Sequence, residues 1–174
     1  INALFGYGSF TKENIDMTSK ALKYFGYGIP AFALIKVLAN FFFARNNTKI
    51  PFYLSAFIVF LNITISLFFF NKIGFLIIPI ATSISTWTGV LIYILILNYK
   101  KILMVQNYLY KNLFKIIVSS ILMCFPLLYG LDYFGNNLEY NNQFKSVYLL
   151  FIISFAATIY LISCYLLGIL NIKN

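Results

Sequence analysis

The sequence predicts an all-α fold, a polytopic membrane helix bundle of about five transmembrane helices. Apolar residues make up 61% of the chain and charged residues only 10%, whereas a soluble domain carries roughly a quarter charged residues. The mean hydropathy is +0.86. Several apolar runs are also long enough to span a membrane, because about 20 helical residues cross a hydrocarbon core about 30 Å thick.

Five apolar runs are predicted to form the spans, with ends uncertain by a few residues. They lie at about 20–44, 51–71, 73–98, 111–131 and 146–170. Pro51 suits the first turn of the second helix, where its missing N–H is not needed. The turn "NKIG" (71–74) leads into the third helix and "NYKK" (98–101) ends it, while the longest polar connection, 131–146, precedes the last span.

Residues 1–19 precede the first predicted span and are expected to be a segment outside the membrane that leads into it; the family resemblance described below implies that it is periplasmic. They lack the basic start and the apolar core of roughly 7–15 residues that mark a signal peptide. The chain begins with Ile1. We therefore expect a fragment, the C-terminal part of a longer protein.

Basic residues divide unevenly between the two predicted sides of the membrane. Alternate connections hold Arg45, Lys49, Lys100, Lys101, Lys111, Lys115 and Lys173. The opposite set holds Lys12, Lys20, Lys23, Lys72 and Lys145, together with the acidic residues Glu13, Asp16, Asp132 and Glu139. Since positive residues accumulate on the cytoplasmic side, the first set and the C-terminus are predicted to be cytoplasmic.

Several function classes receive no support from the sequence. The net charge of +9 is spread singly or in pairs between apolar runs, unlike the basic patch of a nucleic-acid-binding protein. The chain has no histidine, and Cys124 and Cys164 both lie in apolar runs without a CxxC motif, so a metal or disulfide site is not expected. No nucleophile–base pair, paired carboxylates or phosphate loop is present, and we expect no enzyme.

Lys36 is the most unusual charged residue, because it lies inside the run "FALIKVLANFFFARNNTKIP" (32–51). Arg45 is nine residues further on, which at 1.5 Å per residue puts Lys36 roughly 13 Å from the helix end. A charge at mid-span costs about 2.5–3.5 kcal/mol on insertion scales. Either Lys36 extends toward the membrane surface or pairs with a neighbouring carbonyl, or it faces a cavity that receives an anion.

The second and third predicted spans carry a set of polar side chains. Asn62 and Ser66 are four residues apart and share one helix face. Thr82 belongs to the hydroxyl-rich segment "IATSISTWTG" of the next span. Small hydroxyl residues often join packed membrane helices. The alternative is a candidate cation site of oxygen ligands from Asn62, Ser66 and Thr82.

The order of these segments resembles the C-terminal part of the MurJ (MviN) lipid II flippase family, in the multidrug/oligosaccharidyl-lipid/polysaccharide exporter superfamily. The similar pieces are "LFGYGSFTKENIDMTSKAL" (4–22), "YGIPAFALIKVLANFFFARNNTKIP" (27–51), "LNITISLFF" (61–69), "GFLIIPIATSISTW" (74–87) and "FAATIYLISCYLLGIL" (155–170). The likeness is specific in the first hundred residues; towards the end it is mainly one of hydropathy.

This resemblance implies that residues 20–174 are the last five of fourteen spans, in the C-terminal lobe of a multi-pass bacterial inner-membrane protein whose N-terminal lobe is missing here. It implies alternating-access transport of lipid II, an undecaprenyl-pyrophosphate-linked peptidoglycan precursor, with lipid II, membrane lipids and the missing lobe as partners. No nucleic acid is expected. The implied role of Lys36 is a substrate-cavity cation facing the pyrophosphate, and the last two spans would form the groove for the lipid tail.

Some members of the family carry a sodium site with an Asn, an Asp one turn away and a Thr on the next helix. Asn62 and Thr82 match those positions, but Ser66 stands in place of the carboxylate, which weakens the case for Na⁺; no other cofactor is implied. Arg45 is expected to make a helix-end contact, since the family's acidic neighbour is absent. The alternatives are an exporter of other lipid-linked polysaccharides or of drugs by cation antiport, and a stand-alone five-span scaffold.

Overall fold

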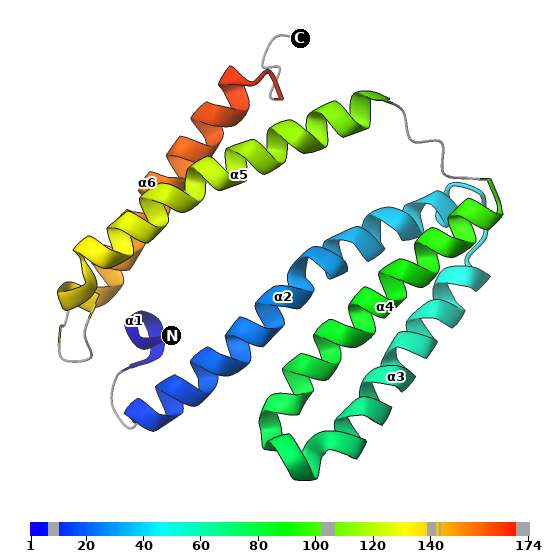
Figure 1. Ribbon diagram of the computed structural model, residues 1–174, viewed down its shortest axis with the longest axis horizontal. Helices are drawn as coiled ribbons and strands as arrows, with labels where there is room; N and C mark the ends of the chain where they lie inside the picture. Colours follow the sequence, from blue (N-terminus) through cyan, green and yellow to red (C-terminus); the bar gives the residue numbers. More distant parts are fainter. Residues whose placement is uncertain (7–10, 102–106, 139–141, 143, 170–174) are drawn as a thin grey trace. The chain divides into compact units, whose positions relative to one another are not determined.

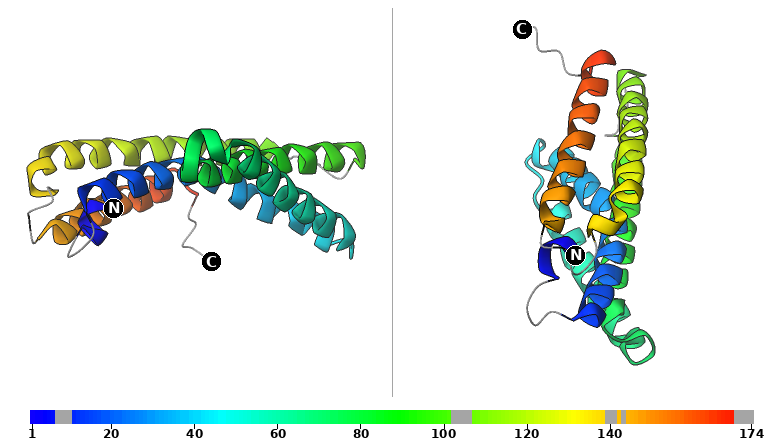
Figure 2. Two further views of the ribbon diagram at one scale, coloured as in Figure 1. Left: turned by 90° about the horizontal axis from the view of Figure 1, so that it is seen from below. Right: turned by 90° about the vertical axis from the view of Figure 1, so that its left-hand side faces the viewer.

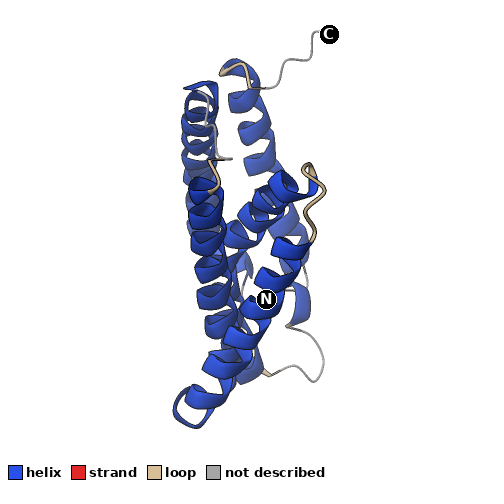
Figure 3. Ribbon diagram, turned by 90° about the vertical axis from the view of Figure 1, so that its right-hand side faces the viewer, coloured by secondary structure: helices blue, strands red, loops and turns tan. Residues whose placement is uncertain are grey.

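The computed structural model describes residues 1–6, 11–101, 107–138, 142 and 144–169. Every regular element in this part of the chain is helical (Figures 1 and 3). The long helices are α2 (Lys12–Phe43), α3 (Lys49–Ile73), α4 (Ile77–Tyr99), α5 (Asn107–Tyr133) and α6 (Lys145–Leu166). Short elements are α1 (Asn2–Phe5), η1 (Gly74–Leu76) and η2 (Gly135–Leu138). The prediction of an all-α membrane helix bundle is confirmed.

Four stretches of the described chain are long and apolar enough to cross a membrane: Lys12–Phe43, Lys49–Tyr99, Tyr110–Tyr133 and Lys145–Leu166. The second stretch contains both α3 and α4, which fold back on each other at η1 (Figure 1). Gly74 has φ +71° at this turn, a conformation that glycine adopts without steric cost. The four stretches therefore hold the five long helices that the sequence predicts.

The helix ends differ from the predicted ends for local reasons. Helix α2 begins at Lys12, eight residues before the predicted span, because Thr11 caps it: the Thr11 hydroxyl accepts the Asn14 amide at 3.3 Å. Helix α6 ends at Leu166 because Gly168 takes φ +66°. The Ile169 amide then donates back to the Cys164 carbonyl at 3.0 Å, which closes the helix in a Schellman motif.

The chain divides into two compact units, one of residues 16–104 and one of residues 1–15 with 105–174. The predicted boundary between a periplasmic segment, 1–19, and a membrane region, 20–174, is a statement about the membrane and stays a prediction. Each unit has its own packing.

The unit of residues 16–104 packs most of α2 with α3 and α4. Its core consists of Ala31, Leu38, Ala39, Phe42, Leu54, Val90, Tyr93 and Leu97. The rings of Phe42 and Tyr93 lie 5.9 Å apart. Small residues allow close approach: a Cβ added to Gly89 would meet Ile58 Cδ1 at less than van der Waals distance. Close packing of this kind stabilises helix contacts in lipid, where hydrophobic burial contributes little.

The other unit pairs α5 with α6, and Figure 2 shows the two helices alongside each other in both views. Gly130 is the point of closest approach: a Cβ there would lie 3.1 Å from Ile152 Cγ2. Helix α1 packs against α6 in the same unit.

Candidate functional site

Lys36 lies on the face of α2 that is turned away from the core of its own unit. The buried stripe of α2 runs through Ala31, Leu38, Ala39 and Phe42, whereas Lys36 is exposed. No hydrogen bond or ion pair joins Lys36 to another residue among those that the structure describes. Lys36 is therefore not paired with a carbonyl of another described residue in its own unit. The alternative in which its side chain extends toward the membrane surface stays a prediction.

Arg45 lies two residues after the end of α2 at Phe43. Its Nη1 donates to the Phe41 carbonyl at 3.3 Å, one turn back along the helix. Asn46 takes φ 53°, and the Asn47 amide reaches the Phe42 carbonyl at 3.0 Å. Arg45 therefore lies at a helix end whose free carbonyls favour a cation.

The structure brings Asn62, Ser66 and Thr82 together between α3 and α4. Asn62 Nδ2 donates to Thr82 Oγ1 at 3.0 Å, and the Ser66 hydroxyl donates to Asn62 Oδ1 at 3.3 Å. The Thr82 hydroxyl donates to the Ile78 carbonyl at 2.8 Å. We call this set the α3–α4 triad.

This donor set does not fit a sodium ion. A hard cation needs several oxygen ligands, preferably charged ones. In the triad the amide N–H group of Asn62 faces Thr82, and its oxygen already accepts from Ser66. All three side chains are neutral. Within the described ranges no group of three or more His, Cys, Asp or Glu residues that could hold a metal is found.

Two further α4 side chains, not singled out from the sequence for this role, bind the backbone of α2. The Ser83 hydroxyl donates to the Tyr24 carbonyl at 2.6 Å, and Trp87 Nε1 donates to the Tyr27 carbonyl at 2.9 Å. Tyr24 and Tyr27 precede Pro30 by six and three residues. Pro30 has no N–H and so removes the helical hydrogen bond to the Gly26 carbonyl, which neither α4 side chain replaces. The only sequence signals for this contact are the four-residue spacing of Ser83 and Trp87, which puts both on one face of α4, and the glycines of "GYGIP" (26–30) in α2.

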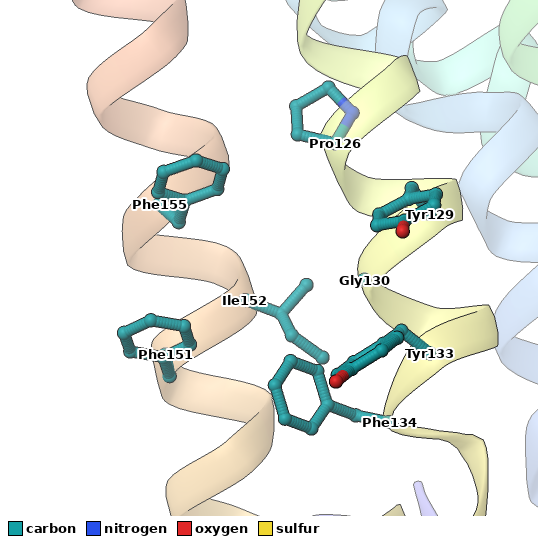
Figure 4. Close-up of a pocket in the computed structure, with 8 residues that line it drawn as sticks. All are labelled: Pro126, Tyr129, Gly130, Tyr133, Phe134, Phe151, Ile152 and Phe155. Carbon is teal, nitrogen blue, oxygen red and sulfur yellow. The ribbon is translucent and has the colours of Figure 1, made fainter.

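An apolar groove of about 470 Å³ lies between α5 and α6. Figure 4 shows its lining: Pro126, Tyr129, Gly130, Tyr133, Phe134, Phe151, Ile152 and Phe155. Because Gly130 has no side chain, Ile152 fits against the α5 backbone at the base of the groove. None of these eight residues was proposed from the sequence; the resemblance implied only that these two helices form a groove.

Aromatic rings form a continuous series along this groove. Tyr129 stacks on Tyr133 at 6.3 Å, and Phe151 stacks on Phe155 at 6.5 Å. Phe134 joins the two helices, because its ring lies 6.4 Å from that of Phe151. Tyr129 and Tyr133 are both more than 70% exposed. The groove therefore offers an open aromatic surface that suits a long apolar chain.

These features define a class of protein: a multi-pass helical membrane protein with an unpaired lysine within one long apolar helix and an apolar groove between two others. The family model described as "MurJ: Lipid II flippase MurJ" matches residues 1–149. The chain belongs to this family, and the resemblance drawn from the sequence is confirmed.

Individual relatives agree with the family match. The chain is 29% identical over 170 residues to "Probable lipid II flippase MurJ" of Buchnera aphidicola subsp. Schizaphis graminum, covering 95% of this chain and 32% of that protein. It is 29% identical over 136 residues to "Lipid II flippase MurJ" of Thermosipho africanus, covering 78% of this chain and 27% of that protein. The chain thus spans about a third of the length of the curated relatives that it matches.

Proposed function

We propose that this chain forms part of a lipid II flippase. The protein would move an undecaprenyl-pyrophosphate-linked peptidoglycan precursor across the bacterial inner membrane by alternating access, in cell-wall biosynthesis. The observation that carries the proposal is Lys36, a cation within a long apolar helix that faces away from its own helical unit and has no described partner.

The chemistry of Lys36 suits a phosphate-bearing ligand. A lysine is a compact charge with three donors, and it binds phosphate oxygens without demanding one fixed geometry. Placing this charge within a membrane helix is unfavourable unless a partner or water compensates it. The pyrophosphate of a transported substrate would pair with Lys36 while the substrate is bound. In the protein without substrate, Lys36 would have no such partner.

The groove between α5 and α6 suits the other end of such a ligand. Its aromatic and aliphatic lining (Figure 4) provides contacts for a polyprenyl chain and few polar groups that would have to be desolvated. A substrate with a charged head and a long apolar tail needs both kinds of surface.

In this proposal the opposite wall of the substrate cavity comes from the part of the relatives that the chain does not match. The C-terminus lies in the cytoplasm and the connection between α5 and α6 in the periplasm, as the distribution of basic residues predicts. The family match favours lipid II over other lipid-linked polysaccharides or drugs as cargo, and it gives a stand-alone scaffold no support.

The test is translocation of fluorescent lipid II in vesicles by the protein as its gene encodes it. We expect transport by the wild type and a fall of about tenfold or more for Lys36→Met, which corresponds to about 1.4 kcal/mol of lost interaction. Lys36→Arg should retain part of the activity, because it keeps the charge. Lys72→Met is the matched control, since Lys72 lies exposed at the end of α3.

Two results would contradict the proposal in different ways. Absence of lipid II movement by a folded wild-type protein would overturn the function itself. Wild-type rates for Lys36→Met, with lipid II moved normally, would leave the function standing and remove Lys36 from the substrate path.

A further inference from the structure

Lys145, the first residue of α6, is completely buried. Its Nζ donates to the Gly6 carbonyl at 2.7 Å, across 139 positions of the sequence. A lysine charge removed from solvent is strongly unfavourable unless polar groups surround it. The contact with Gly6 therefore requires that the first six residues be folded against α6.

Two neighbouring contacts support the same arrangement. The hydroxyl of Ser146, next to Lys145, donates to the Ala3 carbonyl of α1. Asn2 Nδ2 donates to the Leu138 carbonyl of η2 at 2.8 Å. Residues 1–6 are thus bound both to the end of η2 and to the start of α6. We call these contacts the α1 clasp.

Gly6 makes the clasp possible through its missing side chain. A Cβ at this position would lie 2.5 Å from both the backbone oxygen and the side-chain oxygen of Asn2. The Gly6 amide donates to that same backbone oxygen at 3.0 Å. Any larger residue would force Asn2 away from Leu138 or the Gly6 carbonyl away from Lys145.

The clasp is directly connected to one end of the α5–α6 groove. The Leu138 amide donates to the carbonyl of Phe134 at 3.1 Å, and Phe134 lines the groove. On the α6 side, Tyr148 lies one turn after Lys145, and its ring is 5.5 Å from that of Phe134. Fixing Leu138 and Lys145 therefore fixes the rings that close this end.

We propose that the α1 clasp is a positioning device that closes the groove at the α5–α6 connection and limits the length of apolar tail that the groove accepts. Lys145, Ser146 and Asn2 are its positioning residues. The proposal rests on the lipid-transport function proposed above, because that function supplies the apolar tail. Without the clasp, η2 and the start of α6 separate, and Phe134 no longer packs against Tyr148 and Phe151.

The experiment compares variants in the protein as its gene encodes it, with two readouts. Lys145→Met removes the donor to Gly6, and Gly6→Ala disturbs the same contact from the other side. Lys111→Met and Gly135→Ala are the matched controls, because Lys111 is exposed and a Cβ on Gly135 meets nothing within 4 Å. The Gly6 variant keeps the test valid should the lysine variant fail to fold.

The first readout is hydrogen exchange at the amides of Leu4, Phe5 and Gly6, which bond within α1. We expect exchange about tenfold faster or more in both clasp variants, as for a locally unfolded segment, and no change in the controls. The second readout is the affinity for polyprenyl phosphates with short, medium and long tails. The wild type should bind long tails more weakly than medium ones, and the clasp variants should lose this difference.

Unchanged exchange in Lys145→Met and Gly6→Ala would overturn the clasp. Faster exchange with an unchanged tail-length preference would overturn its role in the groove, while lipid transport itself would stand. If the wild type bound no polyprenyl phosphate of any length, the proposed function and the groove role would both fall, whatever the exchange rates.

Discussion

At the residue scale, α2 is held to α4 by side chains that bond to backbone. Ser83 and Trp87 donate to carbonyls of α2 that precede Pro30. Gly28 lies one turn after Tyr24 and directly follows Tyr27, and its missing Cβ leaves room for Ser83. These bonds hold the part of α2 before Pro30, whereas the buried residues Ala31, Leu38, Ala39 and Phe42 hold the part beyond it.

Gly28→Ala should destabilise the protein, although alanine is the better helix former by about 1 kcal/mol. The new Cβ would lie 2.9 Å from Ser83 Oγ and 3.3 Å from Ser83 Cα, so it forces apart two helices at their point of contact. We expect a net loss of about 1–2 kcal/mol, measured as a lower thermal unfolding temperature in detergent.

Gly26→Ala is the matched control for this prediction. Gly26 lies in the same helical segment, but a Cβ there meets nothing within 4 Å. Its substitution should leave stability unchanged or increase it. Equal destabilisation by both substitutions would show that helix backbone flexibility, rather than the contact with Ser83, decides the outcome.

At the element scale, the α3–α4 triad joins two helices that the turn at Gly74 already brings together. Its bonds run from Ser66 to Asn62 and from Asn62 to Thr82. Hydrogen bonds of this kind between membrane helices contribute about 0.6 kcal/mol on average. The triad therefore adds modest stability. Because its donors are neutral, we expect this stability not to depend on which cation is in the buffer.

Ser66→Asp should turn the triad into a cation site, because it supplies the charged oxygen that the set lacks. The wild type should unfold at the same temperature in sodium and potassium buffers of equal ionic strength. The aspartate variant should be more stable in sodium. Ser66→Asn, neutral and nearly the same size, is the control; a sodium-specific shift in the wild type would contradict this account of the triad.

The elements show what the sequence could and could not predict. Apolar runs located all five long helices, because membrane-spanning helices must be apolar along their length. They did not reveal the polar start of α2 at Lys12, which the cap at Thr11 determines. The four-residue spacing of Asn62 and Ser66 predicted their proximity. From the sequence, Lys145 was used only as one of the basic residues that indicate membrane orientation. Its contact with Gly6 could not be predicted, because the two residues are 139 positions apart and form no local pattern.

At the scale of the whole molecule, the paired helices imply a definite topology in the membrane. The α2–α3 connection and the α5–α6 connection should lie on opposite sides, because three long helices separate them. The excess of basic residues predicts that the first of these connections lies in the cytoplasm.

Cysteine labelling in intact cells measures this topology. Cys124 and Cys164 are both free thiols and are first replaced by alanine. A cysteine at Asn136, exposed in η2, should react with a membrane-impermeant maleimide, and one at Thr48, exposed before α3, should react only after the cells are opened. The reverse pattern would contradict the predicted orientation, and labelling of both in intact cells would contradict the number of spans.

The clasp also has a consequence for the order of events during synthesis. The helices of residues 16–104 are complete before α6 has been made, whereas Gly6 must wait for Lys145, 139 positions later. At about 5–20 residues per second, roughly 7–28 seconds separate the two on the ribosome. Residues 1–6 can therefore reach their final packing only after α6 has been made, and an insertion machinery that releases α6 late would delay the packing of this segment.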